Sequence, residues 1–328
     1  MDYTIYEELI AGIPGNIRVA DMLRSERRSV VVAEPGDPDV PCAQNAADLS
    51  CTAGAVRGAP AAARAAAAAA AACSVSVRTW GAGANAGACM NFAENTRPPI
   101  AAGAAPGMSL RDLARASLSW NLAEASMGVA AINAYYNDLR LLAGEKGVLV
   151  ETGAPRAAGA RRHGGASGAA AAAAAGGESA GKDKSVDPFE LYRSAYSGKK
   201  VGVIGHFSGL DTDVAPYCEL SIFEREPRPG DYPDEAEEYL LPLMDYVFIT
   251  GCTFANKSLP RLLELSRKAF VVLVGPSVPC APLLFRYGVS VLSSLVFPRP
   301  EDAAAALEST VPHSFTSYGL KISYERSF

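Results

Sequence analysis

Polar residues follow four short apolar runs in the second half of the chain. The runs cover residues 201–204, 220–223, 246–249 and 270–274, and their β-branched and aromatic content is typical of buried parallel strands. In an open α/β sheet, ligands bind just outside the carboxyl ends of such strands. We therefore predict a ligand site formed by the residues that end these runs, which are Gly205, His206, Phe207, Glu224, Arg225, Thr250, Cys252, Thr253 and Ser277.

His206 and Glu224 are the best placed of these side chains for metal or proton chemistry. His206 suits a metal ligand or a proton-transfer group, and the alternative is a histidine that caps its loop by hydrogen bonds. Glu224 follows Gly205 by 19 residues, the spacing of a ribose-binding acid in nucleotide-binding folds. The first loop, GVIGHFSG, lacks the glycines that let a pyrophosphate approach, so a carboxylate for a metal or an amine is the better interpretation. A surface pair of Glu224 with Arg225 is the alternative.

The loop TGCTFANK, residues 250–257, carries the richest set of polar groups. It offers two hydroxyls, a thiol, an amide and an ammonium, from Thr250, Thr253, Cys252, Asn256 and Lys257. Near a helix N-terminus these groups suit an oxyanion or a phosphate, and a thiol is a ligand for soft metals. For Cys252 we favour the alternative of a small packing residue. For Asn256, the alternative to ligand contact is that it caps the next helix together with Ser258.

Asn121 and Glu124 are two further candidates from the first half of the chain. They are three residues apart on the first turn of a predicted helix, so they share a face. We expect both to project toward the strand ends if that helix end faces them. The alternative is an ordinary helix N-terminus, where both residue types are favoured.

Strands and helices alternate in the second half of the chain. Helices are expected at 234–245, 258–268, 281–287 and 300–309, and a further strand at 289–295. This alternation with short connections predicts an α/β fold with a parallel, doubly wound sheet and helices on both faces.

The first half predicts a smaller α+β unit. A helix at 3–11 precedes a hairpin of strands 17–23 and 29–33, and a third strand is expected at 87–92. Ser109, with Asp112, is predicted to cap a helix, and a longer helix follows at 121–142. Ala125, Gly128 and Ala131 give that helix a small-residue face for close packing.

Composition limits the classes of function. The chain has 328 residues, which suggests two domains. We place the first domain at 1–150, with a low-complexity insertion at about 35–84. The second domain is placed at 185–328 and follows a Gly/Ala-rich linker at 151–184. The net charge is −5 without a basic stripe, which argues against a nucleic-acid partner. The seven cysteines form no CxxC, and the alanine runs are too short to span a bilayer. We expect a cytoplasmic, reduced protein without a membrane partner.

Several motifs in order resemble one known family. VGVIGHF, IFER, FITGCTFANKS and VLVGPSVP, with SLRDLARASLSWNLAEASMGVAAINAYYN upstream, resemble the "putative heavy-metal chelation" family, a domain of unknown function. The resemblance covers residues 17–33, 87–142 and 199–295. It implies an enolase-N-terminal-like α+β domain followed by a Rossmann-like domain, with the candidate site in the cleft between them.

The first functional hypothesis is therefore the binding of a transition metal ion, or of a small metal-bearing or anionic ligand, in the interdomain cleft. His206, Glu224 and Cys252 are the candidate metal ligands. If their strands are neighbours, His206 and Glu224 lie about 5 Å apart and reach one ligand. One alternative is an enzyme that uses a nucleotide-type cofactor at the same loops, and another is a non-catalytic scaffold or sensor.

Overall fold

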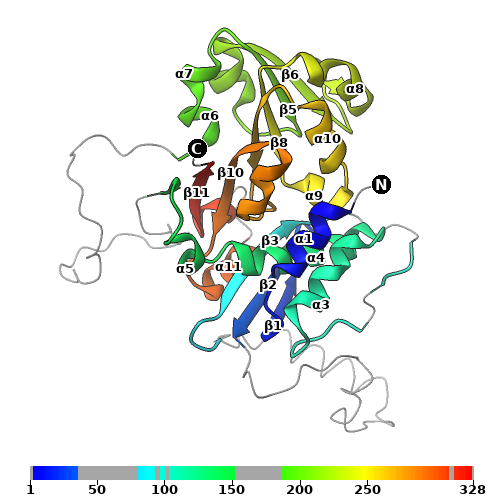
Figure 1. Cartoon of the computed structure of the whole chain (residues 1–328), viewed down its shortest axis with the longest axis vertical. Helices are drawn as coiled ribbons and strands as arrows, with labels where there is room; N and C mark the ends of the chain where they lie inside the picture. Colours follow the sequence, from blue (N-terminus) through cyan, green and yellow to red (C-terminus); the bar gives the residue numbers. More distant parts are fainter. Residues whose placement is uncertain are drawn as a thin grey trace, which may run out of the picture.

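The chain forms an eight-stranded sheet and a three-stranded sheet (Figure 1). The structure is a computed structural model that describes residues 3–35, 80–92, 97–100, 103–151, 186–309 and 314–326. The predicted insertion at 35–84 and the predicted linker at 151–184 fall almost wholly outside these residues. Among the helices that are described, none has the length and apolar character needed to cross a membrane.

The large sheet is mostly parallel, as predicted. Its order is β4-β11-β10-β9-β8-β5-β6-β7, in which the pairs from β10 to β7 are parallel and β11 is antiparallel to both β10 and β4. The strands are β4 Val148–Val150, β5 Lys200–Ile204, β6 Glu219–Glu224, β7 Tyr232–Pro233, β8 Tyr246–Thr250, β9 Phe270–Val274, β10 Val289–Val296 and β11 Leu320–Glu325. β5 and β6 are neighbours, whereas β8 adds to the other side of β5, so the strand order reverses between β5 and β8.

Helices cover both faces of this sheet because its central strands are apolar on both sides. Val203 of β5 packs with Phe248 on one face, and Ile204 packs with Ile249 on the other. The short helices α6 and α7 lie on the first face, and α8, α9 and α10 lie on the second (Figure 1). Their bounds are α6 Pro188–Leu191, α7 Arg193–Tyr196, α8 Glu237–Leu240, α9 Cys252–Asn256 and α10 Leu259–Leu265. The predicted fold class is confirmed.

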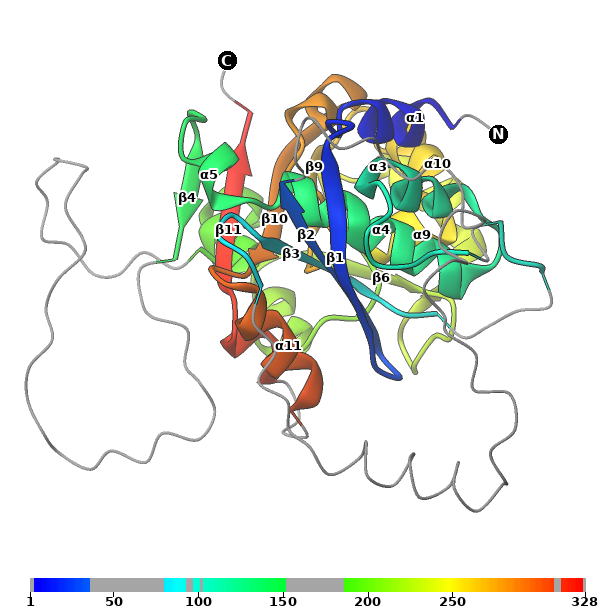
Figure 2. The same cartoon turned by 90° about the horizontal axis from the view of Figure 1, so that it is seen from below.

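The small sheet is antiparallel and has the order β1-β2-β3, with bounds Ile17–Arg24, Arg28–Pro35 and Asn85–Met90. Helix α4, Leu122–Tyr136, packs on β2 and β3 (Figure 2). Glycines permit this close approach: a Cβ on Gly87 of β3 would lie 2.0 Å from the Ala134 nitrogen. A Cβ on Gly128 would lie 2.0 Å from the Ser117 nitrogen, so the predicted small-residue face of the helix is used.

Two predicted helices in the first half of the chain are shorter than their sequence patterns. The helix that follows Ser109 is α3, Leu110–Ala114, which tightens into a 3-10 helix at Arg115–Leu118, and the Ser109 side chain makes no capping bond. The predicted helix at 121–142 divides into α4 and α5, Leu139–Leu142. At the division, the Asn137 side chain bonds the chain after β9, donating to the Val278 oxygen at 3.0 Å and accepting from the Cys280 nitrogen at 2.8 Å, and Asp138 caps α5.

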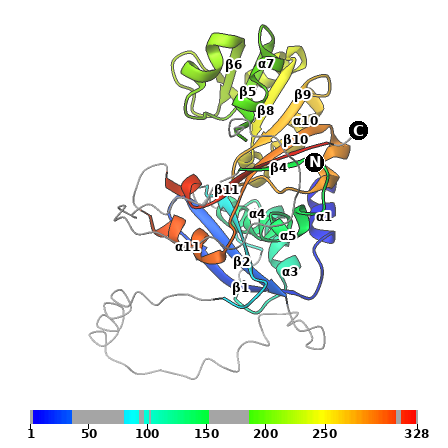
Figure 3. The ribbon, with the colours of Figure 1, turned by 90° about the vertical axis from the view of Figure 1, so that its left-hand side faces the viewer.

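The C-terminal segment returns to the small sheet. Helix α11, Pro300–Glu308, packs on β1, β2 and β3 rather than on the large sheet (Figure 3). Phe297 accordingly shares an apolar cluster with Val30 and Val32. In the other direction, β4 precedes the predicted linker yet pairs with β11 of the large sheet. The bounds assigned to the two domains stay a prediction.

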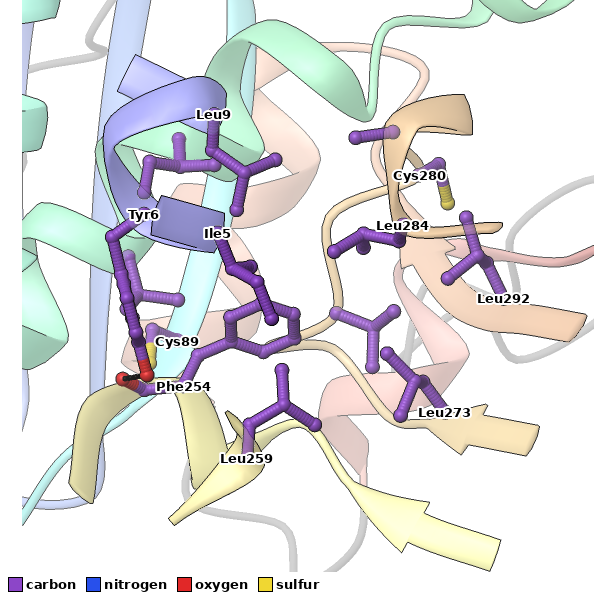
Figure 4. Close-up of a cluster of buried hydrophobic side chains, with 14 of the residues drawn as sticks. Ile5, Tyr6, Leu9, Cys89, Phe254, Leu259, Leu273, Cys280, Leu284 and Leu292 are labelled. Carbon is purple, nitrogen blue, oxygen red and sulfur yellow. Dashed lines mark hydrogen bonds between the residues drawn. The ribbon is translucent and has the colours of Figure 1, made fainter. Parts of the chain in front are cut away.

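One apolar core joins the two sheets. Figure 4 shows Tyr6 of α1, Thr4–Ala11, against Phe254 of α9, with Leu259 and Leu273 in the same buried cluster. The Tyr6 hydroxyl donates to the Phe254 carbonyl oxygen at 3.0 Å, and both side chains are fully buried. The Asn133 amide of α4 donates to the Pro276 oxygen at 3.2 Å in the same way. Polar as well as apolar contacts therefore fix the two sheets relative to each other.

Candidate functional site

A cavity of about 430 Å³ lies at the carboxyl ends of the central strands. It opens where the strand order reverses between β5 and β8, which is the usual ligand position in an open α/β sheet. Ten of the predicted site residues line it: Gly205, His206, Phe207, Glu224, Arg225, Thr250, Cys252, Thr253, Asn256 and Ser277. The small sheet supplies the facing wall through Arg28, Met90, Asn91 and Phe92.

His206 lies beside an aspartate that its sequence neighbourhood does not reveal. The Asp231 Oδ2 atom is 3.4 Å from His206 Nδ1, and the two side chains are 6% and 16% exposed. Asp231 is held by its own loop, because the Arg228 backbone nitrogen donates to Oδ2 at 3.0 Å. His206 Nδ1 is buried and forms no hydrogen bond with a described residue, so Asp231 contacts the imidazole as a neighbouring charge. The only sequence signal for Asp231 is its position after Gly230 in a turn.

Glu224 belongs to an acidic group at one end of the cavity. Its carboxylate accepts a hydrogen bond from the Arg225 backbone nitrogen at 2.9 Å, and the Arg225 side chain reaches Asp234 at 3.5 Å. Glu237 also lines the cavity, and burial, with Asp234 next, raises its pKa to about 7. Glu237 therefore titrates near neutral pH and can exchange a proton with a ligand.

The loop after β8 is held by local hydrogen bonds. Thr253 Oγ1 donates to the Thr250 oxygen at 2.7 Å, and the Asn256 side-chain oxygen accepts from the Ser258 nitrogen at 3.0 Å. Asn256 is the last residue of α9 and does not cap α10, whose N-cap residue is Ser258. Burial raises the pKa of the Cys252 thiol, so the thiol is protonated at neutral pH. Ser277 Oγ accepts from the Met90 nitrogen at 2.9 Å and thereby joins the two walls of the cavity.

Three predicted site residues lie outside the cavity lining. Asn121 caps α4 by accepting from the Glu124 nitrogen at 3.1 Å, and the Glu124 carboxylate accepts from the Ile100 nitrogen at 2.8 Å. Both use their polar atoms for the local structure. Lys257 is buried, and its Nζ donates to the Ala255 oxygen at 3.1 Å and lies 5.3 Å from the centre of the Trp120 ring.

Lys257 gives a prediction about stability and pH. Burial lowers its pKa from 10.5 to about 8, so the charged ammonium opposes folding at neutral pH. Lys257→Met keeps the apolar stem, and we expect it to raise the free energy of unfolding by about 1 kcal/mol at pH 7. The gain should shrink between pH 8 and 10.5, where the wild-type lysine becomes neutral. Thermal unfolding across this pH range measures the difference in stability between Lys257→Met and the wild type, and Lys268→Met, at an exposed lysine, is the control. A stability gain that does not depend on pH would contradict the prediction.

The predicted metal ligands do not form a ready metal centre. Among the described residues, no group of three or more His, Cys, Asp or Glu side chains is placed to hold a metal ion. His206 Nδ1 faces Asp231, and the Cys252 thiol is protonated. His206, Glu224 and Cys252 as arranged therefore do not fit a bare ion coordinated by the protein alone.

The chain is an α/β protein with a cavity that lies between a large, mostly parallel sheet and a small antiparallel sheet. Two family models, each described as "Putative heavy-metal chelation", match residues 6–136 and 187–323. The chain is also similar to a protein of unknown function from Desulfitobacterium hafniense, which has a crystal structure and is assigned to the DUF364 family. The two sequences are 31% identical, and the structural match covers 99% of this chain and 98% of that one, with a TM-score of 0.66. The chain belongs to this family, as the motifs predicted.

The chain is similar to two further proteins. A protein of the same family from Pyrococcus horikoshii is 18% identical, with 98% of each chain covered and a TM-score of 0.63, and it supports the fold. An uncharacterized protein from Methanocaldococcus jannaschii is 32% identical over 124 residues, which are 36% of this chain. That match spans 46% of the length of the relative.

Proposed function

We propose that the chain binds a small metal-bearing or anionic ligand in the cleft between the two sheets. The observation that carries this proposal is that four strand ends and the small sheet line one cavity of about 430 Å³ where the strand order reverses. This volume suits a small organic molecule rather than a macromolecule. The family description supports a metal as part of the cargo.

The metal is proposed to arrive with a small organic ligand. Because the described side chains do not supply three clustered donors, most of the donor atoms belong to that ligand. His206, beside Asp231, is the protein group best suited to contact such a complex. The nucleotide-type cofactor stays an untested alternative.

Calorimetric titration of the metal-free protein tests the proposal. The samples are Co, Ni, Cu and Zn ions alone, citrate as a small chelator alone, the same ions with equimolar citrate, and a nucleotide panel. We expect binding by citrate or its metal complexes that is tighter than binding by the bare ions. Tight binding of nucleotides alone would favour the alternative, and no binding in any sample would contradict the proposal.

Asp231→Asn tests the orientation of His206. The amide keeps an oxygen for the Arg228 nitrogen but loses the charge beside Nδ1. We expect ligand affinity to fall by several-fold, up to about ten-fold, with the fold retained, as is usual for a residue that orients a ligand-binding histidine. Asp211→Asn is the matched control, since Asp211 is exposed and lies outside the cavity lining. Equal affinity in both variants would contradict this role.

A further inference from the structure

Arg28 is a cation in the cavity wall without an acidic partner. It is the first residue of β2 and lines the cavity from the small sheet. Its Nε atom is buried, and among the described residues nothing accepts a hydrogen bond from it. The guanidinium carbon lies 4.1 Å from the centre of the Phe315 ring, which fixes the position of the side chain.

Several other arginines of the chain show what is missing at Arg28. Arg286 bonds Glu8 at 2.8 Å, and Arg299 bonds Asp302 at 2.7 Å, although both arginines are largely exposed. No salt bridge involves Arg28 within the described parts of the chain. A guanidinium stays charged at neutral pH, so removing part of it from water without an anion costs free energy.

The charges around Arg28 do not supply this anion. The groups that act on its pKa besides burial are Arg27, which repels it, and the Cys252 thiol. Burial itself lowers the Arg28 pKa, as expected when a cation loses water without gaining a carboxylate. The acids Glu224, Asp234 and Glu237 line the cavity from the β6 side, and Arg225 reaches Asp234.

We propose that Arg28 binds an anionic oxygen group, a carboxylate or a phosphate, of the ligand that occupies the cavity. A guanidinium presents a planar fork of donors that matches two oxygens of either group. This inference rests on the proposed function, because it requires a ligand in the cleft, and it adds the chemical class of that ligand. The ligand then contacts both sheets, with its anionic group at β2 and the remainder near His206.

Calorimetry with citrate and with inorganic phosphate as separate probes tests this role. We expect at least one probe to bind the wild-type chain, and Arg28→Met to weaken that binding by about ten-fold or more. Arg28→Lys should restore part of the affinity, since it returns the charge without the fork. Arg27→Met is the matched control, because Arg27 is the exposed neighbour outside the cavity lining, and it should bind like the wild type. Which probe responds distinguishes a carboxylate ligand from a phosphate ligand.

The outcomes separate this inference from the proposed function. Binding that is lost in His206→Ala but unchanged in Arg28→Met overturns the role of Arg28 and leaves the cleft as the ligand site. Equal losses in Arg27→Met and Arg28→Met also overturn it, because the effect is then one of general charge. The role of Arg28 is also overturned if neither probe binds the wild-type chain at about 10 mM. Circular dichroism and the melting temperature of each variant show that binding is compared between folded proteins.

Discussion

Replacing Gly87 by alanine should destabilise the protein by about 3 kcal/mol or more, the largest stability effect that we predict. The added Cβ would lie 2.0 Å from the Ala134 nitrogen and 2.3 Å from the Asn133 backbone carbon. Both are backbone atoms of α4, so no side-chain rotation relieves the overlap. Either β3 must leave the sheet or α4 must move away from it, and both sheets lose packing because Asn133 also bonds Pro276. Chemical denaturation measures the change.

Gly144→Ala is the matched control for this variant. No atom lies within 4 Å of a Cβ at Gly144, and this residue is exposed. We expect that variant to change stability by less than about 0.5 kcal/mol. A Gly87→Ala protein as stable as the Gly144→Ala protein would show that β3 and α4 are not packed as described.

Replacing His206 by alanine should weaken ligand binding by at least about ten-fold and up to about 100-fold. His206 presents the one imidazole among the residues that line the cavity, and the variant leaves the buried Asp231 carboxylate without it. Glu224→Gln, on the neighbouring strand β6, should weaken binding by about ten-fold. The double variant should lose less than the product of the two effects, since either change already disrupts the shared site. Isothermal titration with citrate and its metal complexes measures these affinities.

Glu219→Gln is the control for the second variant, because Glu219 begins the same strand and is exposed. Wild-type affinity in both His206→Ala and Glu224→Gln would exclude this end of the cavity from ligand binding. The loop of Thr250, Thr253 and Asn256 would then be the remaining part of the predicted site.

The strands that position the site were predictable because their local pattern and their environment agree. The run 270–274 is entirely apolar and, apart from Leu273, β-branched or aromatic, and β9 has these same bounds. The alternation of Leu320, Ile322 and Tyr324 with polar residues also signals a strand, and these residues form β11. β4 is only three residues long and exists because β11 lies beside it, so local sequence does not determine it.

The residues that complete the site were predictable only in part. The strand ends gather because parallel strands share one carboxyl edge, which follows from the alternation of elements. Arg28 reaches the cavity from a different sheet, and Asp231 reaches His206 from a turn, and no spacing in the sequence connects either of them to β5. Asn121 and Glu124 have the residue types of a site, but their polar atoms serve the start of α4.

The amide bonds from α4 to the chain after β9 bear on how a ligand enters and leaves. Asn133 and Asn137 are fully buried, and each donates to a carbonyl oxygen of the chain after β9, Asn133 to Pro276 in the cavity wall and Asn137 to Val278. Separating the two walls would break these bonds and expose the core that Tyr6 and Phe254 share. A hinge movement that opens the cleft between the two sheets is therefore costly. Under the proposed function, we therefore expect a ligand to bind a site that is already formed, without a cost for closing the two sheets around it.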